Sequence, residues 1–287
     1  MADIRLIRRR IKGVKSISKI TRAMEMIATS KMKRAQERGL AGRPYSEKIR
    51  QVIADLSNIS QAERAVHPLL QRRPIKKIAI VHITPDRGLC GGLVANINRR
   101  TGSFILEQPA SASLICVGRK GVDFMRRTRR EIRAEFTGLG DRPSFLDSLP
   151  ISRCIIDDYT NGEIDAAYLA YPQFVSTLVQ NPVVLPLLPI EPEETTSGQN
   201  TDFLYEPDSV TVFEGLLPRF IEMQIYHAIL EAIASEQSAR MVAMKNATEN
   251  AAELVSDLTL MYNKARQEAI TKELLDITGG VEALSPK

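Results

Sequence analysis

The residues best placed for chemistry form a glycine-rich turn, DRGLCGG, at positions 86–92. A lysine-led apolar run at 76–84 precedes it and a helical pattern follows it, which is where a phosphate-binding loop would lie. The turn matches neither the dinucleotide-binding nor the P-loop spacing, and it lacks the lysine that reaches a bound phosphate. We therefore predict a tight strand-to-helix turn that uses glycine for backbone freedom. A nucleotide-dependent α/β enzyme stays open as an alternative.

Two further features could be catalytic. Cys90 lies in the turn, where the start of a helix can lower the pKa of a thiol. No group that would orient the neighbouring His82 is visible, so we expect a packed thiol. Asp157 and Asp158 could form an acid–base pair, but adjacent helical residues do not face each other, and we expect solvated carboxylates. The sequence thus predicts no catalytic residue.

The potential metal ligands are few and dispersed. The sequence holds three cysteines and three histidines, without a CxxC pair or a histidine cluster: Cys90, Cys116, Cys154, His67, His82 and His227. Such an odd, widely spaced set is typical of reduced thiols rather than of a zinc or disulfide framework. We predict no metal site and no cofactor.

Two segments are rich in Lys and Arg, the N-terminal one and RKGVDFMRRTRREIR at 119–133. Either could bind phosphates, although neither has interleaved aromatic residues. A basic coiled-coil protein that binds nucleic acid is therefore a second alternative. The methionines Met24, Met26 and Met32 would also suit a helix lying on a membrane surface.

Charge is distributed unevenly along the chain. Residues 1–50 hold 15 Lys and Arg against 4 Asp and Glu, a net charge of +11. Residues 51–205 hold 17 of each kind, and residues 206–287 hold 7 against 13, a net charge of −6. The two ends are thus opposite in sign around a neutral middle.

Both ends have helical periodicity. Apolar residues recur every three or four positions from Ile4, at Ile7, Ile11, Val14, Ile17, Ile20, Met24 and Ile27. This pattern predicts a helix from about residue 3 to 57, kinked or briefly interrupted at Pro44. From Phe220 to Ala265 a heptad seam predicts a coiled-coil helix over 209–277. We expect these two long helices to pair, favoured by their opposite charges.

The middle of the chain alternates strand and helix patterns, which favours an α/β layer with parallel strands. Strands are expected at 76–84, 113–118 and 132–136, followed by a helix in which Pro150 marks a start or a break. Two further strands joined by a turn follow, with Pro172 at an edge or bulge. The fold class predicted is α/β: a long antiparallel coiled coil of the terminal helices plus a central Rossmann-like domain.

The division predicted is an N-terminal coiled-coil helix at 1–57, a central α/β domain at 58–208 with a flexible linker at 191–200, and a C-terminal helix at 209–287. The second helix is the longer one, so roughly 14 of its residues should find no partner in the coil. These are approximately the residues from Asn263 on, where the apolar stripe fades. A helix that short is marginal alone in water, and other chains should therefore surround it.

Several long motifs then resemble a known family. They are ITRAMEMIATSKMKRA near the start, DRGLCGGL after the first strand, LYEPD at 204–208, SEQSARMVAMKNATENA at 235–251 and LTLMYNKARQEAITKELLDI at 258–277. Together they are similar to the gamma subunit of the F-type rotary ATP synthase, in the same order over the whole chain. The resemblance implies a rotor without an active site of its own.

The resemblance also implies partners. The coiled coil would pass through a hexameric ring of alpha and beta subunits, and the α/β domain would lie beside the epsilon subunit on the c-ring, in one copy per complex. Proton flow through the c-ring would turn the shaft and drive ATP synthesis in the beta subunits. The chain would be peripheral, on the cytoplasmic face of the bacterial plasma membrane, held there only by the complex, and would bind no nucleic acid.

Site residues follow from matching the family motifs position by position. The expected partner contacts, at the beta catch loop and along the upper shaft, are Arg266, Gln267, Thr271 and Glu273. The expected contacts with the acidic beta lever are Met24, Arg22 and Arg240. The expected foot, which meets epsilon and the c-ring, is Tyr205, Glu206 and Asp208. The extra segment of chloroplast and cyanobacterial forms, and the cysteine pair of the chloroplast one, have no counterpart, so redox control is not expected.

Overall fold

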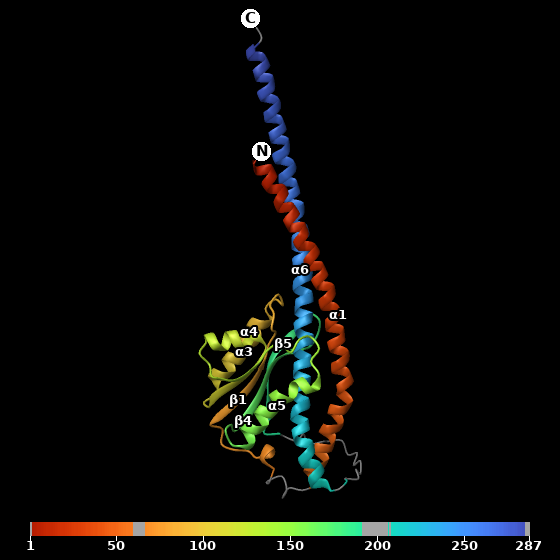
Figure 1. Ribbon diagram of the computed structural model, residues 1–287, viewed down its shortest axis with the longest axis vertical. Helices are drawn as coiled ribbons and strands as arrows, with labels where there is room; N and C mark the ends of the chain where they lie inside the picture. Colours follow the sequence, from red (N-terminus) through yellow and green to blue (C-terminus); the bar gives the residue numbers. More distant parts are fainter. Residues whose placement is uncertain (1, 60–66, 191–205, 207, 285–287) are drawn as a thin grey trace. The chain divides into compact units, whose positions relative to one another are not determined.

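The computed structural model describes residues 2–59, 67–190, 206 and 208–284 (Figure 1). A long helix, α1, spans Ala2–Ile59, and an even longer one, α6, spans Ser209–Leu284. The elements between them are a 3-10 turn η1 (Pro68–Leu70), β1 (Lys77–Ile83), α3 (Leu93–Glu107), β2 (Ser111–Val117), α4 (Arg119–Arg127), β3 (Ile132–Phe136), α5 (Phe145–Thr160), β4 (Ala166–Phe174) and β5 (Gln180–Leu188). The predicted linker at 191–200 lies outside the described residues.

The chain forms two compact units. Residues Met1–Ile27 and Met241–Lys287 form one, which we call the coiled-coil unit; Ala28–Arg240 form the other, the α/β unit. Both α1 and α6 contribute to each unit, since neither helix is interrupted where the units divide. The predicted pair of long helices plus an α/β layer is therefore confirmed.

A five-stranded sheet organises the α/β unit, with the strand order β3-β2-β1-β4-β5. The pairs β1–β2, β1–β4 and β2–β3 are parallel, and β5 runs antiparallel to β4. The first three strands are connected through helices, as parallel neighbours require. The chain then crosses to the other side of β1 to form β4, and this gives the doubly wound arrangement of a Rossmann-like sheet.

Helices cover both faces of the sheet, because its strands are buried on both sides. One face, which includes Ile78, Ile80, Leu114 and Cys116, packs with residues of α3 and α4. The other face, which includes Val81, packs with α5, α6 and the α1 residues that belong to this unit. The alternation of successive side chains between the two faces follows from the period of two along a strand.

The helix α6 is buried nearly all round within the α/β unit. Its buried residues are Leu217, Ile221, Ile225, Ala228, Ile229, Leu230, Ala232, Ile233, Ala234, Ser235, Gln237 and Ser238. A helix that is apolar on every side lies inside a core rather than on a surface. Small residues allow close approach here: a Cβ added at Gly42 of α1 would come within 2.8 Å of the His227 ring of α6.

Three prolines test the predicted element boundaries. Pro44 lies inside the continuous α1, so no interruption occurs. Pro150 lies inside α5, and the expectation of a start or break there was wrong. The helix starts at Phe145 instead, where Ser144 and Asp147 form a capping box that satisfies its first amides. Pro172 of β4 is paired with Pro182 of β5, beyond the last β1–β4 pair, so β4 is locally an edge there, as predicted.

In the coiled-coil unit α1 and α6 are antiparallel. Arg8 donates to the hydroxyl of Tyr262 at 2.6 Å, and its guanidinium lies 5.5 Å from the centre of that ring. Further along α1, the hydroxyls of Thr21 and Thr248 are 2.7 Å apart. Moving forward along α1 thus corresponds to moving backward along α6. A polar pair in a coiled-coil seam favours one register over its neighbours.

The buried residues of both helices follow heptad spacing, but they do not include every apolar residue of α1. On α6, Met244, Ala251 and Leu258 are buried, as the predicted seam requires. On α1, however, Thr21 and Ala28 are the buried members, and Ile17, Ile20 and Ile27 are more than half exposed. These three isoleucines therefore lie outside the seam. A seven-residue step keeps the smaller side chains between the helices and turns the isoleucines outward.

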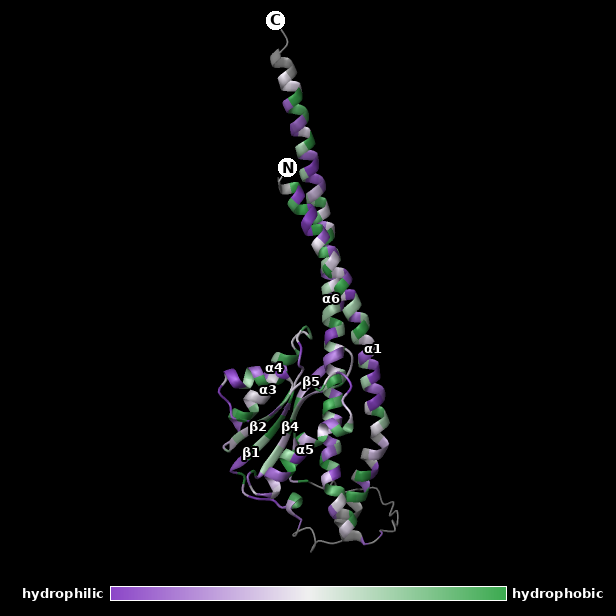
Figure 2. Ribbon diagram, in the orientation of Figure 1, coloured by the Kyte–Doolittle hydropathy of each residue, from purple (hydrophilic) through white to green (hydrophobic). Residues whose placement is uncertain are grey.

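The last part of α6 has little cover within the chain. Ala265 and Ala269 are half-buried, and every side chain from Ile270 to Gly280 is exposed. The helix runs beyond the predicted end at residue 277, through Gly279 and Gly280, to Leu284. In Figure 2 this part alternates green and purple without a continuous apolar stripe. The predicted overhang is confirmed, although the cover extends a few residues past Asn263.

We expect substitutions in the buried part of α6 to lower the free energy of unfolding and those in its exposed part to leave it nearly unchanged. Ile221→Ala removes a side chain that is 0% exposed and should lower the free energy of unfolding by about 2–5 kcal/mol. Leu275→Ala removes one that is 65% exposed and should change it by less than about 0.5 kcal/mol. Urea unfolding of the isolated chain measures both values. Equal losses would contradict the burial described here.

Candidate functional site: the exposed end of α6 and the contacts of Arg240

The four residues predicted to contact partners, at the beta catch loop and along the upper shaft, are all exposed. Arg266, Gln267, Thr271 and Glu273 lie on the part of α6 where cover by α1 ends. Large apolar side chains are exposed along the same part of the helix: Leu260, Met261, Ile270, Leu274, Leu275 and Ile277. A helix that leaves such residues in water presents a surface typical of protein–protein contact.

The residues predicted to meet the beta lever divide between the two units. On α1, Arg22 is exposed and Met24 is half-buried. Near them, Ile17, Ile20 and Ile27 form an exposed apolar stripe with helical spacing. The coiled-coil unit therefore combines a cation with an apolar surface on α1.

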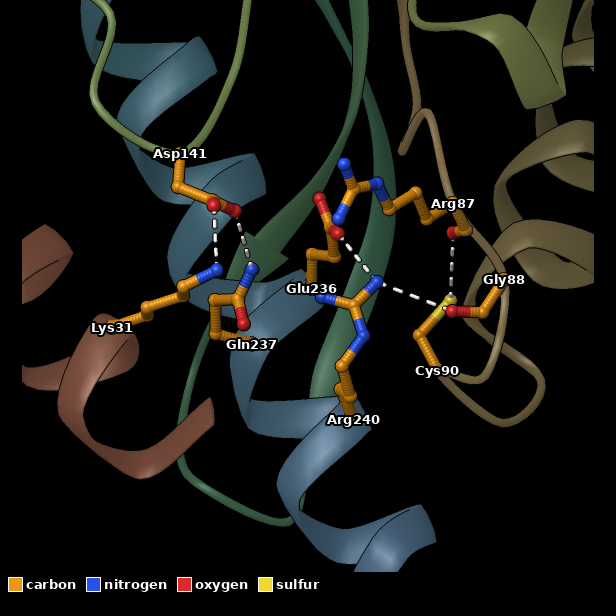
Figure 3. Close-up of polar contacts among 8 residues, drawn as sticks. All are labelled: Lys31, Arg87, Gly88, Cys90, Asp141, Glu236, Gln237 and Arg240. Atoms are coloured by element: carbon orange, nitrogen blue, oxygen red, sulfur yellow. Dashed lines mark hydrogen bonds and ion pairs between the residues drawn. The ribbon is translucent and has the colours of Figure 1, made fainter. Parts of the chain in front are cut away.

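Arg240 belongs to the α/β unit and makes contacts within the chain (Figure 3). Its guanidinium donates to Glu236 Oε1 at 2.6 Å and to the carbonyl of Gly88 at 3.2 Å. Only 11% of the Arg240 side chain and 15% of the Glu236 side chain are exposed. Burial raises the pKa of Glu236, and the charge of Arg240 opposes that rise. The pair therefore fixes the glycine-rich turn to α6.

At the predicted foot the structure shows a helix cap. Asp208 accepts from the amide and the hydroxyl of Thr211, at 2.9 and 2.8 Å, and so caps the start of α6. Glu206 is exposed. Tyr205 lies outside the described residues.

The glycine-rich turn is the predicted strand-to-helix connection between β1 and α3. Leu89 and Gly91 both have positive φ values, 64° and 58°. Cys90 is 2% exposed, and burial raises the pKa of its thiol. A buried thiol with a raised pKa is a poor nucleophile, which confirms the expected packed cysteine.

The crevice where a doubly wound sheet binds ligands lies at the carboxyl ends of its strands, beside the point where strand order reverses. Here that point lies between β1 and β4, and residues of α6 occupy it. Arg240 binds the turn after β1 through Gly88, and the Ser238 hydroxyl donates to the carbonyl of Thr177, in the turn after β4, at 2.7 Å. Side chains of α6 thus bind both turns that border this point.

Two sequence-based expectations about polar residues need correction. His82 does have orienting groups: its Nε2 is 2.8 Å from Asn98 Oδ1, and its Nδ1 is 3.1 Å from the Thr101 hydroxyl. Asp158 is not a solvated carboxylate, since it is buried and bound to Arg133 at 3.2 Å. In both cases the partner lies on a different element, and neither spacing nor periodicity indicates such a pair.

Among the described residues, no group of three or more His, Cys, Asp or Glu side chains could hold a metal ion. Part of the basic segment 119–133 is paired within the chain. Arg126 binds Glu135 at 2.6 Å, and Arg133 binds Asp158 and Glu163. These pairs reduce the cationic surface that nucleic-acid binding would need.

Comparison with known proteins settles the family. A family model described as ATP synthase matches residues 3–284. The chain is 67% identical over 285 residues to the ATP synthase gamma chain of Dehalococcoides mccartyi (strain CBDB1), covering 99% of this chain and 100% of the relative. The chain belongs to the ATP synthase gamma-chain family. A more distant member of the gamma-chain family, from Roseiflexus castenholzii, is 49% identical over 289 residues and covers 99% of both chains.

Solved structures share the fold of this gamma-chain family member. A chain of the Euglena gracilis mitochondrial ATP synthase rotor has a TM-score of 0.64 at 22% identity, covering 94% of this chain and 99% of that one. A chain of the Tetrahymena thermophila mitochondrial ATP synthase central stalk and c-ring has a TM-score of 0.61 at 22% identity, covering 79% and 99%. Within the described part of the chain, none of the helices is long and apolar enough to cross a membrane.

The buried His82 predicts a pH dependence of stability. Burial lowers the pKa of His82 to about 4 from 6.5, and its bond to Asn98 opposes that shift. The unfolded chain therefore binds the proton first: the stabilisation is complete above pH 6.5 and is lost as the pH falls towards 4. The loss should approach about 3 kcal/mol. Urea unfolding of wild type and His82→Gln between pH 7 and pH 4 measures it. If the free energies of unfolding of wild type and His82→Gln fell in parallel between pH 7 and pH 4, the lowered pKa of His82 would be contradicted.

Proposed function

We propose that this chain is the rotor of an F-type ATP synthase, the central-stalk subunit that couples proton flow through a c-ring to ATP synthesis and hydrolysis by alpha and beta subunits. It is a non-catalytic subunit of that enzyme. The observation that carries the proposal is the continuity of α6, a single helix that is a core element of the α/β unit and also half of the coiled-coil unit. Torque applied to one unit reaches the other through unbroken backbone.

The exposed end of α6 supports a position inside a ring of other chains. Side chains from Ile270 to Gly280 are all exposed, and a helix of that length is marginal alone in water. A surrounding sleeve of alpha and beta subunits would cover its apolar residues. Arg266, Gln267, Thr271 and Glu273 would then exchange hydrogen bonds with partners, at the beta catch loop and along the upper shaft, as it turns.

The surface of α1 supports a contact with the acidic lever of beta. Arg22 supplies a cation, while Met24 and the exposed isoleucines beside it supply apolar area. Opposite charge across such a contact mainly speeds association and fixes orientation. Arg240 remains a proposed lever contact, but a beta carboxylate would have to compete with Glu236 for its guanidinium.

The base of α6 would form the foot. Glu206 and Asp208 are exposed, and together with Tyr205 they are proposed to meet epsilon and the loops of the c-ring. Membrane association would come only through this complex, with the chain peripheral on the cytoplasmic face of a bacterial plasma membrane.

Reconstitution tests the proposal directly. Alpha and beta subunits assembled with this chain should hydrolyse ATP, and a bead attached to the α/β unit should rotate in one direction. Assemblies with and without the chain are compared under the same conditions. If adding the chain brought neither activity nor rotation, the rotor function would be rejected.

Charge reversal at the exposed end of α6 should impair the complex without unfolding the chain. We expect Arg266→Glu together with Glu273→Lys to lower assembly or ATP-driven proton pumping about tenfold, as loss of a pair of contacting groups can do. The free energy of unfolding of the isolated chain should change by less than about 0.5 kcal/mol, because both side chains are exposed.

The matched control reverses an ion pair on the α/β unit. Arg100 Nη1 and Glu107 Oε2 are 3.8 Å apart on α3. Arg100→Glu with Glu107→Arg should leave both pumping and stability near wild type. Parallel losses of stability and pumping in the Arg266–Glu273 variant would argue against a contact with partners.

A further inference from the structure

One carboxylate in the α/β unit binds both long helices. Asp141 lies in the loop between β3 and α5. Its Oδ2 accepts from Lys31 Nζ of α1 at 2.6 Å, and its Oδ1 accepts from Gln237 Nε2 of α6 at 3.1 Å (Figure 3). Each oxygen therefore serves a different helix.

The loop that carries Asp141 is itself held in place. Asp86, in the glycine-rich turn, accepts from the amide of Gly138 at 3.0 Å and from the amide of Arg119, the first residue of α4, at 2.9 Å. Gly138 and Gly140 have φ values of 79° and 73°, a conformation that other residues rarely adopt. Asp141 is thus presented from the sheet edge in a defined conformation.

Lys31 and Gln237 lie near the limits of the helical segments that belong to the α/β unit. Lys31 and Gln237 lie a few residues from Ile27 and Met241, where α1 and α6 pass from the α/β unit into the coiled-coil unit. Around Lys31, the buried side chains of α1 are Ala28, Met32 and Ala35, of which two are small. Small apolar residues allow close approach but resist sliding of one helix along another only weakly. A polar tie at this level would oppose such sliding.

We propose that Asp141 is a positioning residue of the rotor: it ties α1 and α6 to the α/β unit where both helices leave it, and so keeps them in register when torque is applied. The proposal rests on the rotor function proposed above. Lys31 and Asp141 have side chains 35% and 41% exposed, and exposed ion pairs contribute little to stability. The consequence of the tie is therefore resistance to twisting rather than resistance to unfolding.

The experiment measures the stiffness of the rotor in assembled alpha–beta complexes. The ring is fixed to a surface, rotation is halted by withholding ATP, and the angular variance of a bead on the α/β unit is recorded. Asp141→Ala should raise this variance above the spread of repeated wild-type measurements, because the two helices are then held to the α/β unit by fewer contacts. Its unfolding midpoint in urea should stay at the wild-type value.

Two further variants separate the tie from a general disturbance of the loop. Asp141→Lys alone should raise the variance, and adding Lys31→Asp should return it towards wild type. The exchanged residues restore the ion pair, and the side-chain oxygen of Gln237 can accept a hydrogen bond from the new ammonium group. Glu135→Ala is the matched control, since it removes an ion pair of the same 2.6 Å length that involves neither long helix. It should leave the variance unchanged.

The outcomes distinguish the two proposals. If wild type does not rotate, the rotor function fails before the tie is tested. If wild type rotates and Asp141→Ala has the same variance as Glu135→Ala, the positioning role is overturned. If adding Lys31→Asp did not lower the variance of Asp141→Lys, the positioning role of the Lys31–Asp141 contact would also be overturned.

Discussion

The rest of this structure depends on the burial of α6 inside the α/β unit. A surface helix needs one apolar stripe, but between Leu217 and Ser238 this helix is buried on nearly all sides, by the sheet and α5 and by α1. Removing it would expose the part of the sheet that it covers together with α5 and α1. Rotation or sliding of the helix against the strands would disturb packing along this whole buried length, so a force on the helix is transmitted to the unit. This constraint makes a Rossmann-like sheet into the base of a shaft.

The same burial explains why a doubly wound sheet need not be an enzyme here. Ser238 and Arg240 extend the packed helix to the carboxyl ends of β1 and β4 and bind the carbonyls of Thr177 and Gly88. A phosphate-binding loop would also need the glycine spacing and the lysine that this turn lacks. The glycines of the turn serve the connection between β1 and α3, and its cysteine is packed. Fold and ligand binding are therefore separable, because function depends on the site rather than on the architecture.

Periodicity predicted the elements, but contacts between distant elements were beyond it. The sequence pattern predicted the two long helices, an α/β layer with parallel strands and the exposed end of α6. The structure confirms these predictions. The apolar spacing predicted that α1 is a helix but not which side faces α6: Ile17, Ile20 and Ile27 are exposed, while Thr21 and Ala28 are buried. The expectation at Pro150 was wrong, since α5 begins before it, at a capping box formed by Ser144 and Asp147, and continues through it. The partners of His82 and Asp141 come from other elements, and no local pattern encodes them. Glu236 pairs with Arg240 four residues further along α6, a spacing that does bring helical side chains together.

The coiled-coil unit has polar contacts in its seam and cations on its surface. Opposite net charges at the two ends favour pairing of the helices, and two polar contacts across the seam support it: Thr21 binds Thr248, and Arg8 binds the Tyr262 hydroxyl. Meanwhile the cations of α1 point outward, with Arg9, Arg10, Lys12, Lys15, Lys19 and Arg22 all exposed. Exposed charges contribute about 0–1 kcal/mol per pair to stability but accelerate association with an oppositely charged surface. The hydroxyl pair therefore favours one register of the two helices, and the exposed cations are available to an oppositely charged surface.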